Sequence, residues 1–87
     1  MDIFINFNQA VNLQQIKLKV NEYFFIHNAY IDVYWRRGDS LEVERINYEN
    51  AEGKSLFTFG GQELKELSGI SIYGVESWVE SLESVCN

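Results

Sequence analysis

Residues 30–48 constrain the fold more than any other part of this sequence. Their first half is rich in β-branched and aromatic residues, and the alternation places Ile31, Val33 and Trp35 on one face of a strand. The next four residues, RGDS at 37–40, are typical of a turn, and the residues after them continue as a partner strand. The chain must therefore form a sheet that contains this β-hairpin.

The outward face of the predicted hairpin carries polar and aromatic side chains. We place Tyr34 and Arg36 on it from the first strand, and Glu42 and Glu44 from the second. The alternation of apolar residues changes phase near Arg45, which we interpret as a β-bulge. The outward side chains could contact a partner, because Tyr and Arg often anchor interfaces, or could be ordinary cross-strand neighbours on a hydrated sheet face.

Three further segments are predicted to be strands. Residues 2–7 alternate, residues 54–59 continue the meander after the hairpin, and residues 70–73 form a short last strand between two glycines. Gly60 and Gly61 end the strand at 54–59. The segment 62–68 after them is predicted to contain a turn or two of helix, with Leu64 and Leu67 pointing inward.

Two segments fit a helix by the spacing of their apolar residues. Segment 12–27 has apolar residues at steps of three and four, although residues 16–20 also alternate, so a hairpin is the alternative there. Segment 75–86 gives the stronger pattern, with Val75, Trp78, Val79 and Leu82 on one side.

These elements predict a single α+β domain that spans residues 1–87. The expected order is β-α-β-β-β-(short α)-β-α, folded as a two-layer sandwich in which two helices cover one face of a mainly antiparallel sheet of about four to five strands. A chain of 87 residues is too short for several domains.

The charge is acidic and unevenly distributed. The net charge is −6, from 13 acidic and 7 basic residues, and ten of the acidic residues fall within residues 39–87. The only adjacent basic pair is Arg36–Arg37, so direct binding of nucleic acid is not expected. An acidic surface would instead attract a basic protein surface.

The candidate acidic surface lies on the predicted C-terminal helix. Glu76, Glu80 and Glu83 would project from one side of this helix, and no Lys or Arg follows Lys65 in the sequence to pair with them. Glu63 and Glu66 would extend the patch if the short helix lies alongside, giving five candidate partner-binding glutamates. The alternative is a solvated face that only keeps the protein soluble.

Catalysis, cofactors and metals are not expected. The sequence has no G-x-S-x-G, P-loop or H-E-x-x-H motif, and one histidine, His27, with one cysteine, Cys86, cannot form the usual structural zinc site. Neither a membrane span nor a secretory signal is recognisable. We therefore expect a cytoplasmic protein that binds neither membrane nor nucleic acid directly.

Two functions remain. In size and charge the chain resembles bacterial toxin-immunity proteins and phage-encoded anti-defence inhibitors, although no motif assigns it to one family. This resemblance implies an inhibitor that mimics nucleic acid and docks on a basic, nucleic-acid-handling protein such as a nuclease. The alternative is a homodimeric structural or regulatory module that uses the sheet face or the free edge of the strand at 70–73.

Overall fold

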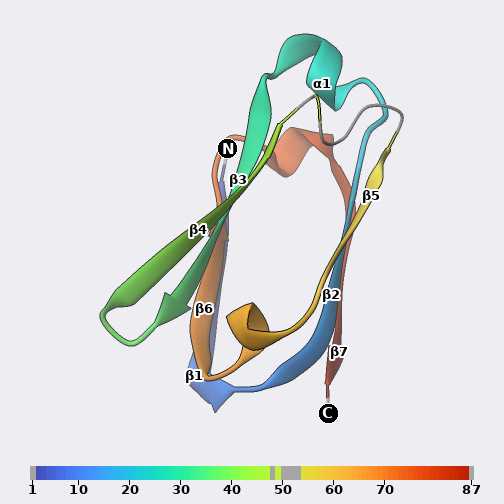
Figure 1. Cartoon of the computed structure of the whole chain (residues 1–87). Helices are drawn as coiled ribbons and strands as arrows, with labels where there is room; N and C mark the ends of the chain where they lie inside the picture. The colour runs from blue at the N-terminus through green and yellow to red at the C-terminus, as the bar shows by residue number, and fades with distance from the viewer. Residues whose placement is uncertain (1, 48, 50–53, 87) are drawn as a thin grey trace.

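Two antiparallel sheets packed face to face make up the computed structural model, which describes residues 2–47, 49 and 54–86 (Figure 1). The first sheet has four strands, in the order β1 (Ile3–Val11), β6 (Leu67–Ile72), β3 (Tyr30–Arg37) and β4 (Ser40–Asn47). The second has three, in the order β5 (Leu56–Phe59), β2 (Leu13–Val20) and β7 (Val79–Cys86). Short helical turns connect them: α1 (Phe24–His27), η1 (Gln62–Leu64) and η2 (Glu76–Trp78).

The expected helix at 12–27 is wrong, because most of this segment is strand β2. Ile16, Leu18 and Val20 are buried between the sheets while Lys17 and Lys19 point away, which is the alternation of a strand with one buried face. The alternation at residues 16–20, on which the hairpin alternative rested, is confirmed as strand, but no hairpin forms within 12–27. Phe24–His27 is helical, and β2 pairs with β5 and β7 instead.

The expected C-terminal helix is wrong as well. Only Glu76–Trp78 is helical, as one 3-10 turn, and the chain then runs as β7 along β2. The segment forms a strand although its apolar residues also fit a helix. As a strand it pairs with β2, which gives every second backbone group a hydrogen-bond partner, and Leu82 still packs against the core. The chain is thus a β-sandwich with single helical turns, and the prediction of an α+β sandwich covered by two helices is overturned.

The hairpin is confirmed, but its register differs from the predicted one. Pairing is continuous from Arg37 opposite Ser40 to Tyr30 opposite Asn47, so there is no bulge at Arg45. A two-residue loop sets this register, with Gly38 at φ +58°, as the first loop position of a type II′ turn requires.

The strand predicted at 70–73 is also confirmed as part of β6. It lies in the middle of the first sheet, between β1 and β3, so it offers no free edge.

The core fills the space between the sheets. Trp35 of β3 packs edge-on against Phe59 of β5, with ring centroids 5.3 Å apart, and both are almost fully buried. Phe24 of α1 and Leu64 of η1 close the two ends of this core. The face of the first sheet that points away from the core is therefore free to carry other side chains.

Candidate functional site

The outer face of the first sheet carries an apolar cluster, here called the outer aromatic face. The sheet register aligns Phe4, Ser71, Tyr34 and Val43 in one row across the four strands. Tyr73 packs edge-on against both neighbouring rings, at 5.4 Å from Phe4 and 5.2 Å from Tyr34. The outer aromatic face consists of five residues: Phe4, Tyr34, Leu41, Val43 and Tyr73.

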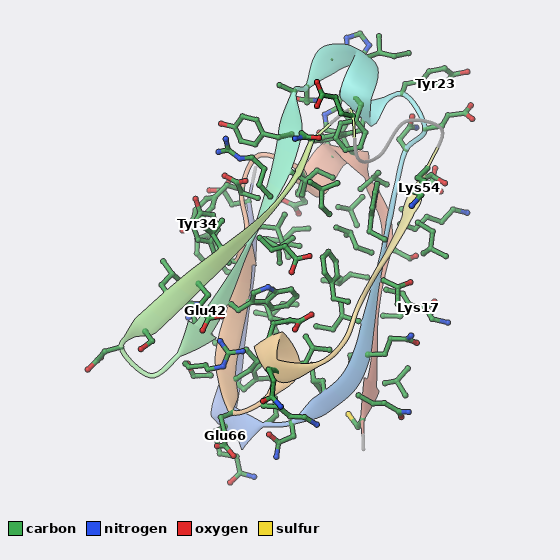
Figure 2. All side chains as sticks on the ribbon, viewed as in Figure 1. Lys17, Tyr23, Tyr34, Glu42, Lys54 and Glu66 are labelled. Carbon is green, nitrogen blue, oxygen red and sulfur yellow. The ribbon has the colours of Figure 1, made fainter. Side chains whose placement is uncertain are left out.

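Four of these five side chains are unusually exposed for apolar residues of a sheet. The exposed fractions are 55% for Phe4, 58% for Leu41, 57% for Val43 and 48% for Tyr73. Phe4 lies on β1, Leu41 and Val43 on β4, and Tyr73 directly after β6. Tyr34 of β3, labelled in Figure 2, lies between them in the sheet and joins them into one surface. A contiguous apolar patch on a small protein often marks an interaction site.

The charged residues beside the outer aromatic face are neutralised within the chain. Arg45 donates two hydrogen bonds to the carboxylate of Asp32, at 2.8 and 2.9 Å, and its guanidinium lies 3.7 Å from the centre of the Tyr30 ring. These hydrogen bonds from Arg45 are the main reason that the pKa of Asp32 falls below its usual value; partial burial opposes the shift. The margin of the face is thus polar but carries little net charge.

Arg36 lies on the same outer face as Tyr34, as predicted. Its Nη2 donates a hydrogen bond to the Ile5 carbonyl of β1 at 2.7 Å, and its guanidinium crosses over Gly69 of β6 on the way. The side chain is partly buried and committed to this bond, so it stabilises the sheet.

Glu42 and Glu44 do not share this face. In the observed register they lie opposite Trp35 and Val33, on the inner face of β4. Glu42 forms an ion pair with Arg37 at 3.2 Å. Their predicted grouping with Tyr34 and Arg36 is therefore wrong, because the two-residue loop shifts β4 by one position relative to the phase that we inferred.

Glu44 lies at an open groove between the edges of the two sheets, here called the β4–β5 groove. The groove has a volume of about 590 Å³ and is lined by Glu44, Ile46 and residues 54–59. Partial burial raises the pKa of Glu44, and the negative charge of Glu63 raises it further. The indole N–H of the buried Trp35 has no partner in hydrogen-bonding geometry among the described residues, although its donor is near enough to Glu44 to oppose these increases in pKa.

The other predicted site residues are dispersed over several elements. Glu76 lies on η2, Glu63 lies on η1, and Glu66 follows η1 with a positive φ of 54°. Glu80 and Glu83 lie on β7. The prediction that Glu76, Glu80 and Glu83 share one helical face is wrong, because that helix does not exist.

Two lysines of β2 lie beside the glutamates of β7. Lys19 forms an ion pair with Glu80 at 3.5 Å, and Lys17 is directly opposite Glu83 in the strand pairing. Lys17 points away from the first sheet in Figure 2. These lysines are far from the glutamates in sequence, so only the strand pairing brings the opposite charges together.

The sequence prediction missed four residues of the outer aromatic face: Phe4, Leu41, Val43 and Tyr73. Phe4 could have been found from the alternation at residues 3–7, where it points to the side opposite the partly buried Ile3, Ile5 and Phe7. Leu41 and Val43 required the correct hairpin register, which depends on the length of the loop.

Neither metal sites nor membrane helices are present in the described part of the chain. Residues 2–47, 49 and 54–86 contain no group of three or more His, Cys, Asp or Glu side chains that could hold a metal ion. Within the same ranges, no helix has the length and apolar character that crossing a bilayer requires. Comparisons of the chain with protein-family models, with curated proteins and with solved structures found no match.

Proposed function

We propose that this chain is a non-catalytic protein-interaction module that forms a homodimer through its outer aromatic face. The observation that supports this proposal is the continuous exposure of Phe4, Leu41, Val43 and Tyr73 around the half-buried Tyr34. Water-facing positions of an antiparallel sheet are usually polar, which gives the regular alternation of such strands. Here the exposed positions of the outer aromatic face carry apolar side chains, so covering them would be favourable.

The composition of the face suits a protein interface. Aromatic residues are enriched in the cores of interfaces and among the residues that contribute most to binding. Tyr34 and Tyr73 each combine a rigid apolar ring with a hydroxyl group, and neither has to be reoriented, because edge-on contacts already hold the three rings in place. Binding would therefore cost little side-chain entropy.

A second copy of the chain suits this face better than a charged partner. The nearby charges of Asp32 and Arg45 already neutralise each other, and Arg36 is committed to the Ile5 carbonyl. An apolar, self-complementary patch is what a two-fold symmetric interface uses, because the same surface is presented by both copies. Two such sheets would pack about 10 Å apart, as in other sandwiches.

The inhibitor hypothesis stays a prediction. Its expected acidic helix is absent, and Glu80 and Glu83 lie beside Lys19 and Lys17, so the C-terminal glutamates no longer support it. The absence of catalysis also stays a prediction. We place the homodimer in the cytoplasm, where the exposed thiol of Cys86 would remain reduced.

The oligomeric state in solution tests the proposal. Light scattering coupled to size exclusion, run from low to high micromolar protein, is expected to show a dimer. The variant Val43→Glu places two like charges in the interface and should weaken the dimer by roughly 100-fold or more, because the buried charges lack partners.

Ile26→Glu is the matched control, because Ile26 is an equally apolar residue, 70% exposed on α1 and outside the face. This variant should dimerise as the unaltered chain does. A monomer at every concentration, or equal dimerisation of Val43→Glu, would overturn the proposal.

A further inference from the structure

We propose that the free edge of β4 accepts an extended segment of a partner protein as an added antiparallel strand, and that this segment carries Lys or Arg where it faces Glu42 and Glu44. The site adjoins the outer aromatic face at Leu41 and Val43, but it differs from that face in using the backbone edge and the inner side chains of β4. It would place a basic, extended partner against the first sheet and the β4–β5 groove.

The edge of β4 is open along most of its length. β4 is the last strand of the first sheet, and within the described residues it pairs only with β3. In a hairpin with a two-residue loop, the residue pair next to the loop is hydrogen-bonded and the pairs alternate from there. The backbone N–H and C=O groups of Leu41, Val43 and Arg45 therefore point away from β3, which is the pattern that an added strand requires.

This edge lacks some of the usual protections against strand addition. The sequence has no proline, and the β3–β4 pairing has no bulge. What the edge does carry is charge, from Glu42 and Glu44 on its inner face. Charges at such positions select which strand can be added, because side chains opposite each other in neighbouring strands interact directly.

These charges disfavour the pairing of two copies of β4 about Val43, the centre of the edge. Antiparallel pairing of two β4 strands about Val43 would place Glu42 of each copy opposite Glu44 of the other, and like charges directly opposite are unfavourable. A partner strand with Lys or Arg opposite Glu42 and Glu44 would replace this repulsion between like charges with attraction. Such residues would sit in non-hydrogen-bonded pairs, where opposite side chains come closest.

The inner surface beside this edge has an excess of negative charge. Glu42 is 63% exposed although Arg37 lies beside it, and Glu44 has the like charge of Glu63 nearby. Lys54, which precedes β5, adds a positive charge to the β4–β5 groove. The basic residues of the partner therefore belong outside the groove, opposite Glu42 and Glu44.

The other face of the added strand would be apolar. Its side chains would lie opposite Leu41 and Val43, which are 58% and 57% exposed. The expected partner segment therefore alternates basic and apolar residues over about five to seven positions, the usual length of a strand.

A seven-residue peptide that alternates Lys and Val, with blocked ends, tests the inference. Fluorescence anisotropy should show binding to the unaltered chain, and the amides of Leu41, Val43 and Arg45 should become protected from hydrogen exchange. A peptide that alternates Glu and Val should not bind. The Lys–Val peptide methylated on its valine amide nitrogens should not bind either, because it retains the charge but cannot pair with the β4 edge.

Two double variants with the same net charge locate the site. The double variant Glu42→Lys, Glu44→Lys should no longer bind the Lys–Val peptide and should bind the Glu–Val peptide instead. Glu80→Lys with Glu83→Lys, on edge strand β7, should keep the original preference. If the first pair prevents folding, Glu42→Gln with Glu44→Gln should still weaken binding about tenfold, as the loss of two ion pairs implies.

The inference would be overturned if the methylated Lys–Val peptide bound as tightly as the unmethylated one. It would also be overturned if both double variants reversed the peptide preference, or if the β4 amides stayed unprotected when the peptide is bound. Self-association is measured separately by light scattering on the chain without peptide. A failure of the homodimer therefore leaves this test unaffected, and the reverse also holds.

Discussion

Arg36 lies directly over Gly69, and the fit depends on the absence of a side chain at the glycine. The Nη2 atom of Arg36 passes this point to reach the Ile5 carbonyl at 2.7 Å. A Cβ atom at position 69 would overlap the guanidinium and would lie 2.6 Å from the Ile5 carbonyl oxygen. One side chain of β3 therefore spans β6 and ties the central strands to the edge strand β1.

Gly69→Ala is expected to destabilise the protein by about 1–3 kcal/mol, the usual cost of an extra group in a filled space. Arg36 could move aside only by giving up its hydrogen bond, and the Ile5 carbonyl belongs to the β1–β6 pairing. Urea unfolding followed by tryptophan fluorescence measures the change. Gly60→Ala is the control, because a Cβ there would meet only the Gln14 carbonyl at an ordinary 3.5 Å. Equal stability of the two variants would contradict this account of Gly69.

Arg37→Lys is expected to destabilise the protein although it preserves the charge. The guanidinium of Arg37 donates to the carbonyls of Lys65 and Gln62, both at 2.8 Å, and lies 3.2 Å from Glu42. A single ammonium group cannot satisfy these separated acceptors, and each lost bond to a charged donor is worth roughly 1.5–3 kcal/mol. Denaturant unfolding gives the magnitude.

The Arg37 variant should also loosen η1, which hydrogen exchange at Leu64 and Lys65 would detect. Lys17→Arg, on the outer side of β2, is a control of the same chemistry and should leave stability nearly unchanged. If Arg37→Lys behaves like this control, Arg37 does not anchor η1.

Glu44→Gln is expected to stabilise the protein above the pKa of Glu44 in the folded state. Partial burial raises this pKa, the charge of Glu63 adds to the increase, and Trp35 opposes it. The folded state then binds the Glu44 proton more tightly than the unfolded state does. Stability is therefore lost as the pH rises from the ordinary pKa of a glutamate, about 4.5, through the raised pKa of the folded state.

Unfolding curves at several pH values measure this difference. The advantage of Glu44→Gln should vanish below about pH 4, where Glu44 is protonated in both states. Glu63→Gln should lower the pKa of Glu44 in an NMR titration, and Glu76→Gln on η2 should not change it. An advantage of Glu44→Gln that persists unchanged in acid would rule out the titration of Glu44 as its cause.

The strands of the first sheet could be predicted because their sequences leave no competing pattern. Residues 30–37 combine β-branched and aromatic residues with strict alternation, and the turn after them marks the hairpin. The apolar sequence at 70–72 likewise excludes an exposed loop. What the sequence left open was the register, because a shift of one residue exchanges the two faces of β4. That shift moved Glu42 and Glu44 inward and Leu41 and Val43 outward.

The second sheet shows the opposite case. In β2 and β7 the apolar residues satisfy a helical period and an alternating one nearly equally well, so local pattern cannot decide between them. Their pairing with each other decides it, because each strand supplies the backbone partners that the other needs.

The sequence alone determined that this is a small acidic chain with a β-hairpin near its centre. It also determined that the chain has enough apolar residues to form one core. Only the tertiary structure decided which charges meet, as Lys19 and Glu80 do, and which apolar side chains remain in water, as Phe4 and Tyr73 do. The physical reason is that both outcomes depend on pairing between distant strands. Alternation within one strand specifies two faces, and the neighbouring strands and the opposing sheet determine which of them is buried.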